Sequence, residues 1–162
     1  MDEVDRILAA WGRELPEVDV SPLGSLSRVS RLAKHLDRAR AEAFAAHELE
    51  VWEFDVLAAL RRQGRPFVLS PGELIHETLS TSGTMTNRVN RLEARDLVVR
   101  EPNPDDGRGV RVRLTSKGRD CVEAALADLL AYERRVLAAI EPPERAELAG
   151  VLARLLAPFE RS

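Results

Sequence analysis

The stretch from Ser82 to Gly118 limits the fold of this chain more than any other part of it. It runs SGTMTNRVNRLEARD, LVVRE, PNPDDGRG and VRVRLTSKG, which predicts a helix, a strand, a turn, a second strand and the start of another helix. A helix with Thr, Asn and Arg on one side suits a groove of duplex DNA, and an arginine-bearing hairpin suits the phosphates beside that groove. The stretch is therefore typical of the DNA-contacting half of a winged helix-turn-helix regulator.

A second short helix precedes this one at helix-turn-helix spacing. The segment SPGE at positions 70–73 has the pattern of a capping box, with serine as the cap, proline in the first turn and glutamate reaching back. The helix that it starts is expected to end at about Leu79. Thr81 or Ser82 then caps the helix that runs through about Arg95, so only about three residues separate the two helices.

Long helices are expected at both ends of the chain. Residues 2–14 form a short amphipathic helix, and the apolar residues from Leu23 to Phe44 keep a three-and-four spacing across more than twenty residues. Thr115 and Ser116 cap a helix that continues to about residue 140, and a last helix follows the two prolines at 142–143. A small compact core does not cover helices of this length, so a partner helix is the expected neighbour.

These elements predict a mainly α fold: a winged helix-turn-helix with long N- and C-terminal dimerisation helices and a small β-hairpin wing. A further helix over residues 50–62 and a single edge strand in PFVL complete its middle part. The expected organisation is N-terminal dimerisation helices over residues 1–47, a winged DNA-binding domain over 48–117 and C-terminal dimerisation helices over 118–162.

The formal net charge of −3 conceals an uneven distribution. Residues 82–119 contain nine Lys or Arg and five Asp or Glu, a local charge of +4, which leaves −7 for the rest of the chain. The local charge, rather than the total, sets the field that a duplex meets. A solvated charged surface is the alternative explanation, so the distribution supports nucleic-acid binding without establishing it.

Three absences indicate where the chain works. No apolar run approaches the ~18 residues of a membrane span, so no membrane partner is expected. The N-terminus, MDEVDRILAAW, is acidic and amphipathic, unlike a signal peptide. A single cysteine cannot form an intrachain disulfide, and the three observations together predict a cytoplasmic protein.

On the predicted recognition helix, a turn of about 100° per residue separates a buried face from a polar one. Met85, Val89 and Leu92 fall together and predict the buried face. On the polar side, small residues allow close approach to base edges, asparagine pairs with adenine, arginine pairs with guanine, and first-turn N–H groups suit a phosphate. An ordinary amphipathic surface helix is the alternative. The DNA contacts expected from this helix are Ser82, Gly83, Thr84, Thr86, Asn87, Arg88 and Arg91.

The turn NPDDGRG is expected to project from the sheet as the wing. Arg108 near its tip suits a minor groove or a phosphate, and Asp106 suits an orienting hydrogen bond to that arginine. Arg111 and Arg113 share a strand face closer to the DNA backbone, and Arg111 is the third DNA contact expected from the hairpin. A plain exposed hairpin with solubilising charges is the alternative.

The chain from about Leu49 to Gly118 resembles the MarR family of bacterial transcriptional regulators. The most specific match is RLEARDLV followed by NPDDGRGVRVRLTSKG, which is similar to the family pattern DPxDRRxxxxxLTxxG. The resemblance implies a homodimer that binds palindromic duplex DNA as a ligand-responsive regulator, in the usual case a repressor. It also implies contacts to DNA by Ser82, Thr84, Thr86 and Arg88 in the helix and by Asp106 with Arg108 in the wing.

Two departures from the family pattern fall at the predicted interface. Asn87 stands where the family often has arginine, and Gly107 stands where it usually has the first of two arginines. The resemblance therefore predicts the fold of this chain, but it does not predict which bases the helix prefers or how tightly the wing binds DNA.

The N-terminal helix resembles the subgroup of this family in which an extra helix packs beside a ligand crevice. Trp11 and Asp55 are similar to the aromatic and acidic positions that the subgroup uses around small anionic effectors, and His76 is a third candidate for this crevice. The resemblance implies a small anionic effector and no cofactor. The alternatives are a dimer-core role for Trp11, a capped or solvated Asp55 and a surface His76.

The sequence does not indicate an enzyme. His35, His47 and His76 lack metal-ligand spacing, and no nucleophile elbow or glycine-rich phosphate loop is present, so neither a metal nor a catalytic site is expected. Cys121 offers an alternative as the thiol of a redox-sensing regulator, against which stands a packed, inert cysteine. A helical interaction module that uses its winged fold for proteins instead of DNA is the other alternative.

Overall fold

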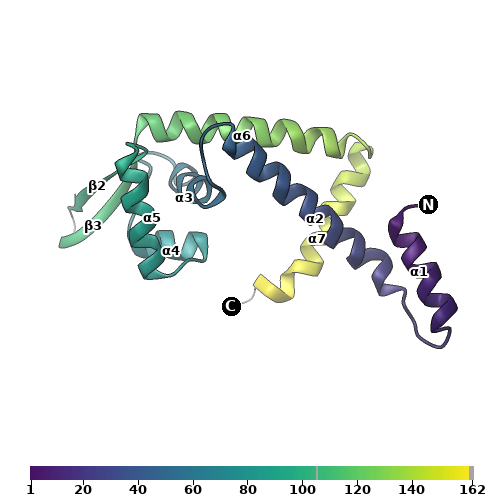
Figure 1. Ribbon diagram of the computed structural model, residues 1–162. Helices are drawn as coiled ribbons and strands as arrows, with labels where there is room; N and C mark the ends of the chain where they lie inside the picture. The colour runs from purple at the N-terminus through teal and green to yellow at the C-terminus, as the bar shows by residue number, and fades with distance from the viewer. Residues whose placement is uncertain (105, 161–162) are drawn as a thin grey trace. The chain divides into compact units, whose positions relative to one another are not determined.

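A computed structural model describes residues 1–104 and 106–160, and for residues 106–108 the description is limited to the backbone. The described chain is mostly helical, with a small antiparallel sheet (Figure 1). The elements in chain order are α1 (Glu3–Glu14), α2 (Pro22–Ala45), α3 (Val51–Arg62), β1 (Val68–Leu69), α4 (Pro71–Thr78), α5 (Ser82–Ala94), β2 (Val98–Asn103), β3 (Asp106–Leu114), α6 (Ser116–Leu137) and α7 (Pro142–Glu160).

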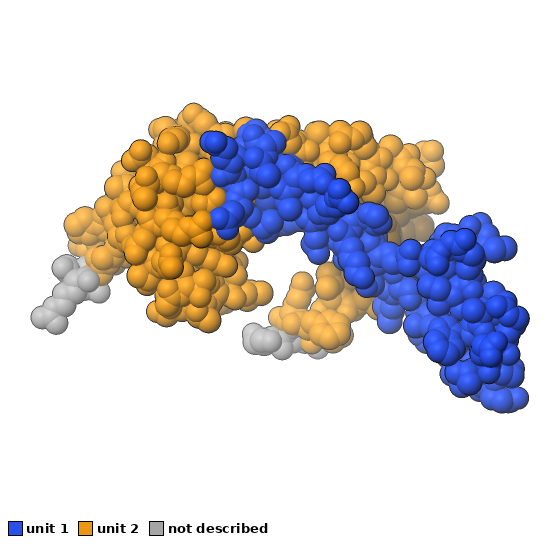
Figure 2. Space-filling view, viewed as in Figure 1, with its two compact units in different colours: residues 1–51 blue, residues 52–162 orange. Residues whose placement is uncertain are grey.

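The chain divides into two compact units, residues 1–51 and residues 52–162 (Figure 2). The first boundary lies within a few residues of the predicted one at 47/48, whereas the C-terminal helices belong to the same unit as the winged segment. The predicted three-part division concerns which helices dimerise, and it stays a prediction. The mainly α winged fold itself is confirmed.

In the first unit, α1 is fastened to α2 by charged groups at its N-terminus. Asp2 caps α1 through a reciprocal capping box with Asp5, which satisfies backbone N–H groups that a helix start otherwise leaves open. Arg28 of α2 donates to both carboxylates, from Nε to Asp2 at 2.8 Å and from Nη2 to Asp5 at 2.6 Å. Val4, in the first turn of α1, is buried.

This cluster predicts that α1 loosens in acid. The hydrogen bond from Arg28, followed by the Asp5 amide, lowers the pKa of Asp2 from 3.8 to about 2. Because the folded-state pKa is the lower one, the stabilisation is present above pH 3.8 and is lost as the pH falls toward about 2. We expect backbone amides of α1 to exchange faster in an Arg28→Gln variant than in the parent at about pH 5, and this difference to shrink as the pH falls to about 2.

Hydrogen exchange followed by mass spectrometry gives the ratio of the exchange rates of variant and parent at each pH. The intrinsic pH dependence of exchange cancels in this ratio. Amides of α5, which lies in the other unit, serve as the internal control. A parent-to-variant ratio that does not change with pH would contradict the role of these carboxylates.

The sheet of the second unit has the order β1-β3-β2 with antiparallel pairing throughout. β1 lies at the edge as predicted, where Leu69 pairs with Val112 of β3. The second hairpin strand was predicted to begin at Val110, and this prediction is wrong because β3 begins at Asp106. Asn103 pairs with Asp106, and a register shift at Pro102/Asn103 accommodates the additional residues of β3.

The helix-turn-helix is formed by α4 and α5, which pack on each other in Figure 1. The predicted capping box at α4 is present, with the Ser70 hydroxyl accepting from the Glu73 amide and the Glu73 carboxylate accepting from the Ser70 amide. Thr81 rather than Ser82 caps α5. Leu79 ends α4 in the left-handed region, with φ of 49°, and turns the chain into α5.

The two C-terminal helices differ in how much they bury. Thr115 caps α6 as predicted, and Val122, Ala125 and Leu129 of that helix are buried. In contrast, α7 buries none of its residues, all of which the structure describes. No helix within residues 1–104 and 106–160 is long and apolar enough to cross a membrane.

Candidate nucleic-acid interface

The recognition helix α5 separates a packed face from a polar exposed one. Met85, Val89 and Leu92 are buried, which confirms the predicted inner face. The residues on the other side that were predicted to contact DNA are exposed: Ser82, Gly83, Thr84, Thr86, Asn87 and Arg91. The exposed side of the first turns of α5 thus carries small or polar side chains, which need no packing partner within the fold.

Hydroxyl groups fix the start of α5. The Thr81 hydroxyl donates to Thr84 Oγ1 at 2.9 Å and accepts from the Thr84 amide at 3.4 Å. One turn on, the Thr86 hydroxyl donates to the Ser82 carbonyl at 3.2 Å. These bonds restrict the rotamers of two predicted DNA contacts, Thr84 and Thr86, before any ligand arrives.

Three arginines form a stripe on one side of α5, and the first turn of α3 holds all of them. Arg88, Arg91 and Arg95 have the spacing i, i+3, i+7. The guanidinium carbons of Arg88 and Arg91 lie over the ring of Trp52, at 5.4 Å and 4.7 Å from its centroid. Arg88 also donates to Ser80 Oγ at 3.3 Å. The guanidinium groups of the two predicted DNA contacts in this stripe therefore have fixed positions beside α3.

The third arginine forms a buried ion pair with the next residue of α3. Arg95 Nη1 lies 2.8 Å from both carboxylate oxygens of Glu53. The Glu53 side chain is 3% exposed and that of Arg95 is 35% exposed. A buried charge of this kind needs its partner, so the pair fixes the C-terminal end of α5 on α3.

Sequence reasoning missed both Trp52 and Glu53. The available signal was the segment VWEFDVLAAL, which places two acids, Glu53 and Asp55, inside an otherwise apolar stretch that an amphipathic surface helix does not explain. It could have been matched to the stripe of arginines on the recognition helix.

Arg100 of β2 and Arg113 of β3 both pair with carboxylates within the fold. Arg100 forms an ion pair with Glu93 and donates from Nη2 to Asn90 Oδ1 at 2.6 Å. The pKa of Glu93 is lowered, first by a hydrogen bond from the Arg100 amide and then by its guanidinium. Arg113 lies 2.9 Å from Glu101 on the facing strand. Arg100 thus connects the hairpin to α5, whereas Arg113 connects the two strands of the hairpin.

Of the predicted wing contacts, Asp106 and Arg108 have side chains that lie outside the described residues. Arg111 is half-buried on β3. Its charge contributes to the lowered pKa of Glu73, after the stronger effect of hydrogen bonds from Ser70. The contribution of these three residues to DNA binding stays a prediction.

The ion pairs change how the local charge of +4 is distributed. Among the residues that the structure describes, several cations of this segment pair with carboxylates: Arg95 with Glu53, Arg100 with Glu93, Arg113 with Glu101 and Arg119 with Asp120. The positive field at the DNA-facing side therefore arises from fewer residues than the sequence count implies.

The candidate effector residues lie in different parts of the chain. Trp11, on α1, belongs to the first unit and is 46% exposed. Asp55 is half-buried on α3, and His76 is exposed on α4, both in the second unit. That the three residues line one crevice stays a prediction.

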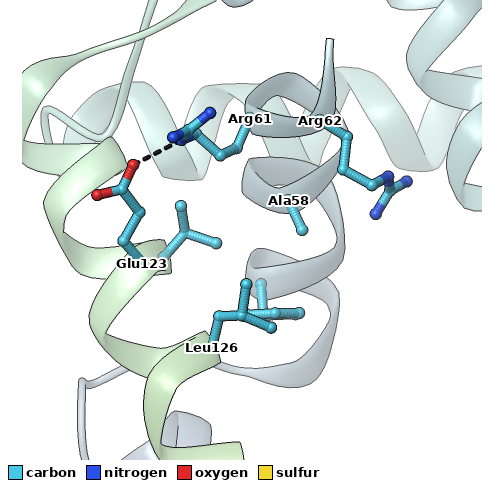
Figure 3. A pocket seen from close by; sticks show the side chains of 7 residues that line it. Ala58, Arg61, Arg62, Glu123 and Leu126 are labelled. Carbon is cyan, nitrogen blue, oxygen red and sulfur yellow. Dashed lines mark hydrogen bonds and ion pairs between the residues drawn. The ribbon is translucent and has the colours of Figure 1, made fainter. Parts of the chain in front are cut away.

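An apolar pocket with a volume of about 150 Å³ lies between α3 and α6 in the second unit (Figure 3). Phe54, Ala58 and Leu126 form much of its wall. Arg61 and Glu123 meet at its edge in an ion pair with Nε and Oε1 2.6 Å apart. Small aromatic molecules bind in apolar cavities of about this size.

Groups that could support other chemistry are sparse in the described part of the chain. Cys121, the candidate redox thiol, is half-buried on α6. Within residues 1–104 and 106–160, no three His, Cys, Asp or Glu side chains gather in a way that would hold a metal ion.

The α4–α5 pair, the exposed polar face of α5 and the β2–β3 hairpin define a winged helix-turn-helix protein. Residues 47–109 match the profile of the MarR family. The chain is 35% identical over 156 residues to the HTH-type transcriptional regulator PecS of Dickeya dadantii (strain 3937), covering 94% of this chain and 92% of PecS. The chain therefore belongs to the MarR family of transcriptional regulators.

Solved structures agree with this assignment. AbsC, a MarR family transcriptional regulator from Streptomyces coelicolor, superposes with a TM-score of 0.77 over 90% of this chain and 98% of its own, at 17% identity, which supports the fold. Bordetella bronchiseptica BpsR superposes with a TM-score of 0.60 over 79% of this chain and 98% of its own, at 26% identity. The DNA binding of BpsR is regulated by 6-hydroxynicotinic acid.

Proposed function

We propose that this MarR family regulator binds palindromic duplex DNA as a homodimer, with α5 in the major groove and the β2–β3 hairpin along the neighbouring phosphates. The exposed polar face of α5 carries the proposal, because its opposite face is packed and its first turns present only small polar side chains. A regulator with this activity works where bacterial DNA lies, in the cytoplasm.

The residues on α5 fit two kinds of contact with DNA. Asn87 is exposed and has the amide chemistry that pairs bidentately with adenine. At Gly83, a Cβ would meet no atom within 4 Å, so the surface there is open to the close approach of a sugar or phosphate. Arg88 and Arg91 supply positive charge along the adjacent stripe.

Exposed apolar residues support the homodimer. Leu26, Val29 and Leu32 are exposed on α2, and Leu126 and Leu130 on α6. The most extreme case is α7, where no residue is buried and the exposed apolar residues are Leu148, Val151, Leu155, Leu156 and Phe159. Helices with such faces are stable in water when a second chain covers them.

We also propose that a small anionic effector controls DNA binding. The acid that regulates BpsR is a small aromatic acid of this class. In this chain, Trp11, Asp55 and His76 remain the candidates from the subgroup resemblance, and the apolar pocket bordered by the Arg61–Glu123 ion pair is a further candidate site. Such a ligand changes DNA affinity only if it binds one conformation of the protein more tightly than the other.

Selection from a pool of random duplexes tests the proposal. We expect the enriched duplexes to contain an inverted repeat with half-sites about one helical turn apart, since a two-fold dimer reads two successive major grooves. With the enriched duplex labelled by fluorescein, fluorescence anisotropy should show affinity that falls steeply with salt. Asn87→Ala should change the enriched sequence, whereas Arg91→Ala should weaken every duplex and lower the salt slope by about one.

The matched control is Arg38→Ala, which removes the same charge from α2 in the other unit and should leave the DNA affinity unchanged. Enrichment of single half-sites would contradict the homodimer. Failure of any duplex to enrich, or affinity that is insensitive to salt, would contradict DNA binding and favour an interaction module for proteins.

A further inference from the structure

We propose that Trp52 is a positioning residue of the recognition helix: its ring holds the guanidinium groups of Arg88 and Arg91 at the edge of the DNA-facing surface and thereby strengthens DNA binding. This inference rests on the proposed function. It assigns a role in DNA affinity to a residue of α3, and α3 belongs neither to the helix-turn-helix nor to the wing.

Two consecutive residues of α3, Trp52 and Glu53, contact all three arginines of the stripe. Trp52 faces the guanidinium groups of Arg88 and Arg91, and Glu53 binds Arg95 one to two turns further along the same stripe. The Glu53–Arg95 pair fixes where the stripe lies against α3, so the ring of Trp52 meets the two arginines in a set position. Both arginines belong to the exposed or half-buried part of α5, where DNA would arrive.

An aromatic ring is a different kind of partner from a carboxylate. Glu53 and Glu93 neutralise the charges of Arg95 and Arg100, which lowers their value for attracting phosphate. A ring attracts the cation through its quadrupole and leaves the charge of +1 in place. A ring face also does not engage the N–H donors of a guanidinium group as a carboxylate fork does.

The gain in affinity comes from restricting side chains before binding. A flexible arginine loses most of its rotamer freedom when DNA fixes it, and that loss opposes association. Arginines already held over Trp52 lose less. For two such side chains, removal of the ring should weaken DNA binding about tenfold, although both charges remain.

Two substitutions that both keep a smaller, apolar side chain test the role of the ring face. Trp52→Phe keeps an aromatic face under both arginines, while Trp52→Leu leaves an apolar side chain without one. On the enriched duplex, we expect Trp52→Phe to bind within about twofold of the parent and Trp52→Leu to bind about tenfold more weakly. Equal affinities for the two variants, or tighter binding by Trp52→Leu, would overturn the proposal.

A double-mutant cycle supplies a readout that a purely structural role would not change. Arg91→Ala should weaken binding less in the Trp52→Leu background than in the parent, because the arginine is already unrestricted there. Arg111→Ala, on β3, serves as the matched control and should weaken binding equally in both backgrounds. An Arg91 effect that is the same in both backgrounds would contradict positioning by the ring.

If Trp52→Leu fails to fold, NMR of the parent decides instead. Ring-current shifts of the Arg88 and Arg91 side-chain protons should be present in the protein alone and in its complex with the duplex. Loss of these shifts on binding would show that the arginines leave the ring, which would overturn the proposal. Absence of DNA binding by the parent is a separate outcome and would contradict the proposed function itself.

Discussion

Arg95→Ala is expected to lower the free energy of unfolding by about 3 kcal/mol, because it removes the guanidinium group that pairs with the buried carboxylate of Glu53. The cost lies at the lower end of the range for broken buried pairs, since the Arg95 side chain is 35% exposed and water can reach part of the vacated site. Urea unfolding followed by circular dichroism measures the change, with an unaltered dependence on urea concentration as the check for two-state behaviour.

Arg38 offers a control, because its ion pair has the same N···O distance as the Arg95 pair but lies in solvent. Arg38 lies 2.8 Å from Glu42, but the two side chains are 81% and 65% exposed. Arg38→Ala should therefore cost less than about 1 kcal/mol. Replacing the buried pair with Glu53→Leu and Arg95→Leu together should restore most of the lost stability, because no unpaired charge remains. Equal losses for the two single arginine variants would contradict this account.

Local sequence patterns predicted most of the fold. The inner face of α5 followed from the spacing of Met85, Val89 and Leu92, since helical periodicity depends only on neighbours along the chain. The same holds for the capping box at Ser70 and the cap at Thr115, in which a side chain bonds to an amide three residues away. These features are encoded within one or two turns.

Contacts between distant residues were not predictable in this way. Glu53 and Arg95 are 42 residues apart, and no local rule relates them. The charge count of residues 82–119 was correct, but it could not reveal which arginines are neutralised by carboxylates. The start of β3 was placed too late because the register shift at Pro102/Asn103 depends on strand pairing rather than on alternation within one strand.

The two kinds of information meet at α5. The sequence predicted which side chains point away from the core, and the structure adds that α3 determines where three of its arginines lie. A substitution on the outer face of α5, for example at Asn87, therefore leaves the contacts to Trp52 and Glu53 in place.

Gly118→Ala is the other substitution with a large expected effect, and it concerns the junction of the wing with α6. A Cβ at position 118 would lie 2.1 Å from the Leu97 carbonyl oxygen and 2.9 Å from Leu114 Cδ1. No rotamer relieves a clash with a backbone atom, and the Leu97 carbonyl also accepts hydrogen bonds from the Thr115 amide at 3.1 Å and hydroxyl at 3.0 Å. The strand and the helix must therefore move apart.

We expect Gly118→Ala to lower the free energy of unfolding by about 2 kcal/mol, since the overpacking exceeds the gain of about 1 kcal/mol in helix propensity. DNA affinity should also fall, because displacement at Leu97 moves the base of the hairpin. Gly12→Ala is the matched control: that glycine lies in α1, a Cβ there meets no atom within 4 Å, and alanine should stabilise the helix by about 0.5–1 kcal/mol. Urea unfolding of both variants measures the difference. If Gly118→Ala is as stable as the parent, the close approach of α6 to Leu97 is not required, and the glycine of the LTSKG segment needs another explanation.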